Sequence, residues 1–290
     1  GPNSIEPNTS TVVRSTMSSS IDWASPQWTF VGNLVAMSAL FLFDKLVAPP
    51  QARWFAIHSF GNLLAVLAAM NATLCTLADP VESMSNLKYN DSSFFGNATP
   101  WPILIVNAIH IYHMVAFKLS SADFFHHAVF ALTMGSTGQL YRLGAFRSFL
   151  VFWLSGLPGG IDYFSLVLVK LGKLDGLTQK RNCAAINVWV RGPCLVLSGF
   201  IIYLNYRYHG HEEGTGYPPM LVSALIAFLC VFNAQYYTKQ SVANHAISHV
   251  LGHVKTRFSI ITGRPTADWD KLISKNDKKS TLKEPQNTVS

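Results

Sequence analysis

Two adjacent histidines, His126 and His127, open the apolar stretch SADFFHHAVFAL at residues 121–132. A neutral imidazole near pH 7 can accept a proton from an amine or a hydroxyl, and it can also carry an acyl group. Adjacent residues on a helix point about 100° apart, so one imidazole can face a cavity while the other contacts a neighbouring helix. The alternative is that both histidines are interfacial anchors or structural hydrogen-bond partners.

Other polar side chains lie inside apolar stretches, where ionisable residues are candidates for function. Asp162 and Arg191 share an estimated depth of about 12 Å at 1.5 Å per residue, which predicts an ion pair. Acyl transfer from a thioester needs, besides a base, a donor that stabilises the oxyanion, and the candidate donors are Tyr141, Arg142 and Ser155. The remaining candidates for lipid or substrate binding lie near the cytosolic ends of their stretches: His113, Asn187 and Asn233.

Most of these polar residues, together with His58, fall in one half of the predicted helices. This distribution predicts a polar cavity that is open to the cytosol and has an apolar inner end. The alternative is polar contact between helices, which should populate both halves. Pro158-Gly159-Gly160 and Gly192-Pro193 predict breaks in two helices, and such breaks are tolerated where backbone is buried or lines a cavity. The alternative to the ion pair is that Arg191 snorkels toward the interface or donates to carbonyls that are freed at the Gly192-Pro193 break.

The elements that position these residues are predicted membrane helices. Of the 290 residues, 49% are hydrophobic and only 13% are charged, whereas a soluble protein carries roughly 25% charged residues. A spanning helix needs about 20 mostly apolar residues. The sequence therefore predicts an all-α polytopic membrane protein with seven transmembrane helices, at 28–48, 53–78, 101–118, 122–140, 146–170, 183–206 and 217–238.

Lysine and arginine gather in the loop 171–181 and after residue 238, which marks that side as cytosolic. The N-terminus is then luminal or extracellular, and the C-terminus is cytosolic. We expect an integral protein of the endoplasmic reticulum or a related endomembrane. The predicted organisation is an N-terminal segment 1–27, a membrane domain 28–240, an amphipathic juxtamembrane helix 241–264 and a basic, disordered tail 265–290.

Glycosylation sequons support this orientation. Those at Asn8, Asn90 and Asn97 fall on the predicted luminal side, whereas Asn71 lies inside a predicted span. The chain is therefore expected to be a glycoprotein. The net charge of +7 does not predict nucleic-acid binding, because the basic residues follow the asymmetry of a membrane protein.

Three histidines in the C-terminal segment, His245, His249 and His253, recur every four residues and share one helix face. Two histidines at this spacing can bind zinc, but no Glu, Asp or Cys nearby completes a tetrahedral set. We therefore predict an interfacial amphipathic helix and no metal site. The four separated cysteines predict free thiols.

The stretches IHIYHMVAFKLSSADFFHHAVFAL, FWLSGLPGGIDYF and VFNAQYYTKQSVAN resemble the TLC domain family over roughly residues 50–240. This family includes ceramide synthases and smaller multi-pass relatives. The resemblance implies a six-helix core with one extra N-terminal span, and it places His126 and His127 at the family's histidine pair. Asp162 matches an aspartate of ceramide synthases, but their His-Asp motif is absent. The chain is therefore more similar to the non-synthase branch, which is linked to membrane lipid composition.

The function expected from these observations is acyl transfer from cytosolic acyl-CoA, a substrate, to a lipid amine or hydroxyl, with no tightly bound cofactor. His126 or His127 would act as base or acyl carrier, and Asp162 would orient it. The alternative is a non-enzymatic lipid-binding protein, and a weaker alternative is a metal-dependent lipid hydrolase. The expected partners are membrane lipids, whether an acyl chain, a long-chain base or a sterol. A homodimer is compatible with the sequence.

Overall fold

All regular structure in the described residues is helical. The computed structural model describes residues 26–119, 121–209, 217–263, 265–266 and 268–269. Five helices are long and apolar enough to cross a membrane: Gln27–Leu46, Pro50–Ala78, Gly144–Lys170, Gly176–His209 and Met220–Thr262. Trp101–Ala116 is apolar but shorter. The described residues confirm the all-α prediction, and the apolar helices fit an integral multi-pass membrane protein.

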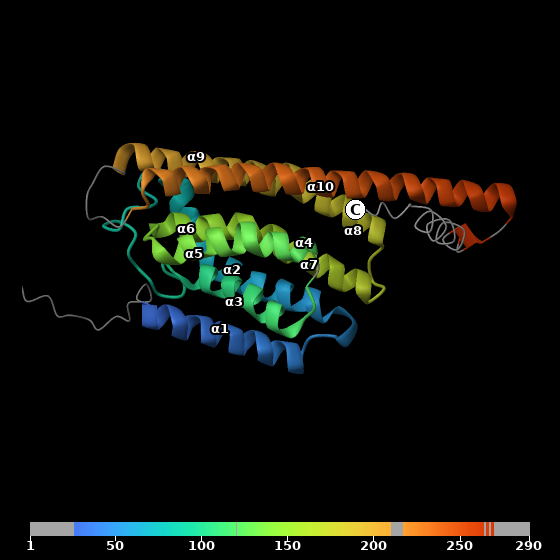
Figure 1. Cartoon of the computed structure of the whole chain (residues 1–290), viewed down its shortest axis with the longest axis horizontal. Helices are drawn as coiled ribbons and strands as arrows, with labels where there is room; N and C mark the ends of the chain where they lie inside the picture. The colour runs from blue at the N-terminus through green and yellow to red at the C-terminus, as the bar shows by residue number, and fades with distance from the viewer. Residues whose placement is uncertain (1–25, 120, 210–216, 264, 267, 270–290) are drawn as a thin grey trace, which may run out of the picture.

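The helices form an elongated bundle along the longest axis of the molecule (Figure 1). Four run without interruption: α1 (Pro26–Leu46), α2 (Arg53–Ala78), α3 (Trp101–Ala116) and α10 (Met220–Thr262). Three further helices each continue through a π-helical turn into the next one: α4 (Ser121–His126) into α5 (Leu132–Leu140), α6 (Gly144–Val151) into α7 (Leu157–Lys170), and α8 (Gly176–Ile186) into α9 (Gly192–His209). We call the end of the bundle that carries α8 the α8 end.

The predicted apolar stretches match these helices unequally. The stretch 53–78 coincides with α2, but the stretches 183–206 and 217–238 are each only part of a longer helix. Hydropathy detects the apolar part of a helix, and polar turns continue α8–α9 and α10 beyond it. Residues 241–262 continue α10 past the other helices at the α8 end (Figure 1). Nearly all of segments 1–27 and 265–290 lies outside the described residues.

Neither helix ends at its predicted break: residues 158–160 lie in α7 and residues 192–193 in α9, and a π-helical turn precedes each position. Pro158 has no N–H to donate to the carbonyl of Leu154, four residues earlier. A π turn at Phe152–Gly156 precedes it, and the Nε of Arg191 donates to that Leu154 carbonyl at 3.0 Å. A second π turn, Asn187–Arg191, precedes Pro193. A π turn, which widens the helix locally, is less costly than ending the helix, because other side chains satisfy the freed carbonyls.

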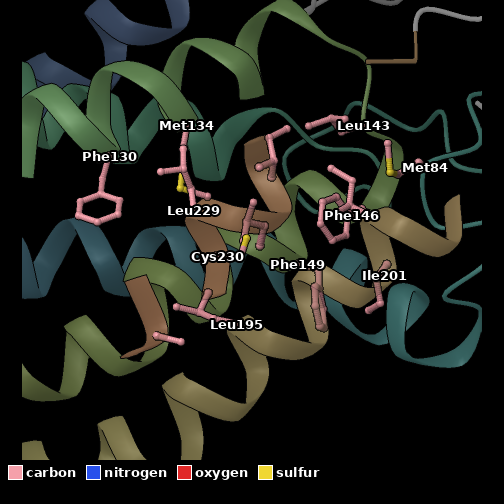
Figure 2. Close-up of a cluster of buried hydrophobic side chains, with 14 residues drawn as sticks. Met84, Phe130, Met134, Leu143, Phe146, Phe149, Leu195, Ile201, Leu229 and Cys230 are labelled. Atoms are coloured by element: carbon pink, nitrogen blue, oxygen red, sulfur yellow. The ribbon is translucent and has the colours of Figure 1, made fainter. Parts of the chain in front are cut away.

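A hydrophobic core joins α5, α6, α9 and α10 (Figure 2). Phe146 and Phe149 of α6 are fully buried there, beside Leu195 and Ile201 of α9 and Cys230 of α10. Large apolar side chains on the outer faces of several helices are instead exposed, as a lipid-facing surface requires: Phe30, Leu34, Phe41, Leu63, Leu67, Phe200 and Phe228.

The loop 79–100 is fixed to the bundle by polar side chains of two helices. Asn205 of α9 accepts a hydrogen bond from the backbone N–H of Met84 at 3.0 Å and donates to the carbonyl of Pro80 at 2.6 Å. Arg147 of α6 donates to the carbonyl of Ala98 at 2.9 Å. The loop therefore closes the bundle at the end opposite α8.

An ion pair joins α1, α2 and α3 near the α8 end. The Nε of Arg53 donates to Asp44 at 2.8 Å, and a second nitrogen of the same guanidinium contacts the other carboxylate oxygen at 2.5 Å. Tyr112 of α3 also donates to Asp44, at 2.8 Å. The Asp44 side chain is fully buried, so these contacts are what makes its charge tolerable there.

Candidate functional site

A cavity of about 430 Å³ lies inside the bundle, between α2, α3, α4–α5, α6–α7, α8 and α10. Along α10 its lining extends from Asn244 to Ile226, which corresponds to roughly 27 Å at 1.5 Å per residue. The volume is within the range of ligand pockets, and its length suits an elongated ligand.

The two halves of this cavity differ in polarity. Toward the α8 end its lining is mostly polar or aromatic: Trp54, His58, His113, His126, Asp162, Asn187, Arg191, Asn233, Tyr237 and Asn244. Toward the opposite end it is mostly apolar: Ile103, Phe130, Met134, Leu143, Leu150 and Ile226. Trp54 and His58 lie in the first turns of α2 and His113 lies in the last turn of α3, and both of these helix ends are at the α8 end of the bundle (Figure 1). An amphipathic molecule fits such a cavity with its polar group toward the α8 end.

Five histidines from three helical segments gather in the polar half. His58 lies on α2, His110 and His113 on α3, His126 on α4 and His127 on the following π turn. The ring centroids of His113 and His127 are 4.4 Å apart, and those of His110 and His127 are 5.1 Å apart. These contacts order the imidazoles into two hydrogen-bonded chains.

The first chain runs from His126 toward α3. The Nδ1 of His110 lies 2.7 Å from the carbonyl of Val106, which only accepts, so this nitrogen carries a hydrogen. In a neutral ring the Nε2 is then an acceptor, and the Nε2 of His126, 3.1 Å away, donates to it. The Nδ1 of His126 therefore accepts from the hydroxyl of Tyr237 at 2.8 Å. Donation passes from Tyr237 through His126 to His110.

The second chain runs from His127 toward α2. The Nδ1 of His58 donates to the carbonyl of Trp54 at 2.8 Å, so its Nε2 accepts from the Nδ1 of His113 at 3.1 Å. The Nε2 of His113 contacts the Nε2 of His127. His113 and His127 are both buried. Trp54 also packs against His113, with ring centroids 4.5 Å apart.

The structure brings seven of the nine predicted site residues to the cavity lining: His113, His126, Ser155, Asp162, Asn187, Arg191 and Asn233. His127 does not line the cavity, because it turns toward His113. Arg142 is exposed in the short connection between α5 and α6, at the end opposite the histidines. It does not line the cavity, and its role as a donor to an oxyanion stays a prediction. Ser155 donates to Asn62 at 2.9 Å.

The predicted ion pair between Asp162 and Arg191 is absent. Asp162 accepts a hydrogen bond from Gln179 at 2.7 Å, and Arg191 donates to the carbonyl of Leu154. The guanidinium of Arg191 also lies over the ring of Tyr237, 4.6 Å from its centroid. Helical rise predicts equal depths for the two residues but no direction for either side chain, and Arg191 uses the carbonyl that Pro158 leaves free.

Three residues of this region were not predicted from the sequence. His110 lies three residues before His113, a spacing that places both on one helix face. Tyr237 shares a face with Asn233, four residues earlier. Arg147 is buried at the apolar end, where it donates to Ala98 and Gly138. The helical spacings of the first two are visible in the sequence, but no sequence pattern distinguishes Arg147 from an interfacial arginine.

The C-terminal histidines lie on the part of α10 beyond the bundle. His249 and His253 are exposed, and their Nε2 atoms are 3.3 Å apart. Among the described residues, no group of three or more His, Cys, Asp or Glu side chains is arranged to hold a metal ion.

No protein-family model, no curated protein and no solved structure matches this chain. The resemblance to the TLC family rests on the sequence motifs alone.

Proposed function

We propose that the chain is a TLC-like, seven-span lipid acyltransferase that uses acyl-CoA from the cytosol. All seven apolar segments cross the membrane, with the N-terminus luminal and the C-terminus cytosolic, in the endoplasmic reticulum or a related membrane. The loop 171–175 and the extension of α10 lie at the α8 end, and lysine and arginine are concentrated there (Figure 1). The cavity then has its polar half toward the cytosol.

The observation that carries this proposal is the juxtaposition of an imidazole cluster with a long apolar cavity. An acyl chain occupies the apolar half, where Phe130, Met134, Leu150 and Ile226 remove it from water. The thioester then lies beside the cluster. Coenzyme A extends toward the α8 end, where acyl-CoA arrives from the cytosol.

In the proposed reaction, a lipid amine or hydroxyl attacks the thioester carbonyl. The new bond joins its nitrogen or oxygen to the carbonyl carbon, and the carbon–sulfur bond then breaks. The proton of the acceptor passes to the imidazole system through Tyr237 and His126, and it finally reaches the departing thiolate of coenzyme A. Tyr237 and His126 are suited to this transfer because they are already hydrogen-bonded.

The experiment is acyl-CoA consumption by purified protein, with a panel of lipid amines and hydroxyls as acceptors. The variant His126→Ala should lose at least the roughly 10²–10⁴-fold that acid–base catalysis contributes. His253→Ala is the matched control, because this histidine is exposed on the extension of α10. Equal rates for wild type and His126→Ala, or no turnover by wild type with any acceptor, would overturn the proposal.

A lipid-binding protein without catalytic activity is the second candidate. One observation favours it: both ring nitrogens of His126 already have partners, in His110 and Tyr237. Imidazoles held in this way also serve as structural cross-links between helices. Absence of turnover, together with a lipid that copurifies in stoichiometric amount, would support this candidate over the acyltransferase.

A further inference from the structure

The side chain of Asn233 on α10 is buried without a hydrogen-bond partner. It is 1% exposed, and it lines the cavity. Neither its Oδ1 nor its Nδ2 has a partner among the described residues. Leaving both polar atoms of a buried carboxamide unpaired is costly, typically about 1–3 kcal/mol for each group.

Other buried asparagines of the bundle do have partners. Asn62 accepts from Ser155 at 2.9 Å, and Asn187 donates to the carbonyl of Cys183 at 2.9 Å. Asn205 contacts Met84, Pro80 and Ser83. These residues bind helices and loops to one another. Asn233 makes no such contact, so a structural role does not account for it.

The position of Asn233 marks the boundary between the two halves of the cavity. On α10, the polar residues that line it recur at helical spacing: Asn244, Ser241, Gln240, Tyr237 and Asn233. Asn233 is the innermost of them, and the next lining residue on this helix is Ile226. Phe130 and Leu154 line the cavity from neighbouring helices. In an amphipathic acyl lipid, this boundary corresponds to the carbonyl, where the polar group meets the chain.

We propose that Asn233 is the carbonyl-binding residue of the cavity and that its ligand is an acyl thioester. This inference rests on the proposed function. The Nδ2 donates to the carbonyl oxygen of the bound acyl group, one helical turn from the hydroxyl of Tyr237. The chain continues from there toward Ile226, and coenzyme A continues toward Asn244.

This placement also gives Asn233 a part in the reaction. When the acceptor attacks, the carbon–oxygen π electrons move onto the carbonyl oxygen, which becomes an oxyanion. A side-chain amide aimed at this oxygen stabilises the charge, and it does so more strongly than it binds the neutral carbonyl. As the carbon–sulfur bond breaks, the charge leaves with the thiolate and the carbonyl re-forms. Asn233 neither gives nor receives a proton.

The test compares two unreactive acyl-CoA analogues, so that binding is measured without turnover. One is a long-chain S-alkyl-CoA thioether, which has no carbonyl, and the other is a matched analogue that keeps the carbonyl as a ketone. Wild type should bind the ketone more tightly by about 3–10-fold, the value of one uncharged hydrogen bond. Asn233→Leu, which has similar volume and no donor, should bind both analogues equally.

The matched control is Asn33→Leu, because Asn33 lies on α1 outside the cavity and has a buried Oδ1 that also lacks a partner among the described residues. This variant should keep the preference of wild type. A second measurement needs no variant: the infrared carbonyl band of a ¹³C-labelled ketone analogue should shift to the frequency of a hydrogen-bonded carbonyl on binding to wild type.

The possible results separate this inference from the proposed function. If wild type binds both analogues equally and the carbonyl band does not shift, the assignment of Asn233 is overturned while acyl-CoA binding stands. A preference that survives in Asn233→Leu overturns it as well. If wild type binds neither analogue, the acyltransferase proposal fails and the assignment fails with it.

Discussion

The hydroxyl of Tyr237 donates to the Nδ1 of His126 across 2.8 Å, and this contact joins α10 to α4 at the polar end of the cavity. This hydrogen bond occupies the only acceptor nitrogen of a neutral His126 imidazole, because the other ring nitrogen donates to His110. A substrate proton therefore reaches His126 through Tyr237. The guanidinium of Arg191 lies over the Tyr237 ring and holds it in place.

Removing the Tyr237 hydroxyl should therefore impair turnover without impairing binding. We predict that Tyr237→Phe lowers the rate of acyl-CoA consumption by about 10²-fold or more, while the affinity for an S-alkyl-CoA stays within twofold of wild type, roughly 0.4 kcal/mol. Tyr236→Phe is the matched control, since Tyr236 accepts from Gln240 and does not line the cavity. Wild-type turnover in Tyr237→Phe would show that the proton takes another path.

The buried carboxylate of Asp44 should be a major determinant of stability. Removing one partner of a buried ion pair costs roughly 3–5 kcal/mol, and we expect Asp44→Asn to fall near or below the lower end because the Arg53 side chain is 36% exposed. Thermal unfolding in detergent measures the effect. Lys45→Gln is the control, because Lys45 is the more exposed neighbour, 3.8 Å from the carboxylate. Equal effects of the two variants would contradict this prediction.

Asp162 and Arg191 should contribute to stability independently. Each has its own hydrogen-bond partner, Gln179 for Asp162 and the Leu154 carbonyl for Arg191. The losses in Asp162→Asn and Arg191→Gln should therefore add in the double variant to within about 0.5 kcal/mol. The free energies of unfolding of wild type, the two single variants and the double variant measure this additivity. Recovery of stability in the double variant would revive the ion pair.

Glycosylation should occur at Asn90 rather than Asn97. Asn90 is exposed in the loop 79–100, whereas Asn97 accepts a hydrogen bond from the backbone of Asp91 at 3.1 Å and Thr99 of its sequon is fully buried. Asn71 lies within α2 and should stay unmodified. A mobility shift on glycosidase treatment, compared between Asn90→Gln and Asn97→Gln, measures this. A second measurement adds protease to sealed microsomes, where it should remove the tail after residue 262. If neither site is modified and the tail is spared, the orientation is the reverse of the proposed one.

The sequence predicted the positions of the helices better than the contacts of their side chains. The apolar stretches 53–78 and 122–140 located α2 and α4–α5, because a helix that crosses a membrane needs about 20 mostly apolar residues. Depth arguments placed His113 and His126 in one region, because helical rise is constant. They failed for Asp162 and Arg191, since depth does not fix the direction of a side chain. The acceptor of Arg191 lies in the π turn between α6 and α7, and the contact depends on how this helix packs against α8–α9, which one sequence does not reveal.

The stability of Asn233 variants provides a last prediction, independent of any ligand. Because both polar atoms of Asn233 lack partners among the described residues, replacing it with leucine removes a desolvation cost of about 1–3 kcal/mol. Asn233→Leu should therefore unfold at an equal or higher temperature than wild type in detergent without lipid. Asn62→Leu is the contrast, because it breaks the hydrogen bond from Ser155 and should lower that temperature. A loss in Asn233→Leu as large as that in Asn62→Leu would mean that Asn233 supports the fold. The carbonyl subsite would then lose its premise, because a carboxamide already engaged within the bundle has no donor to offer an acyl group.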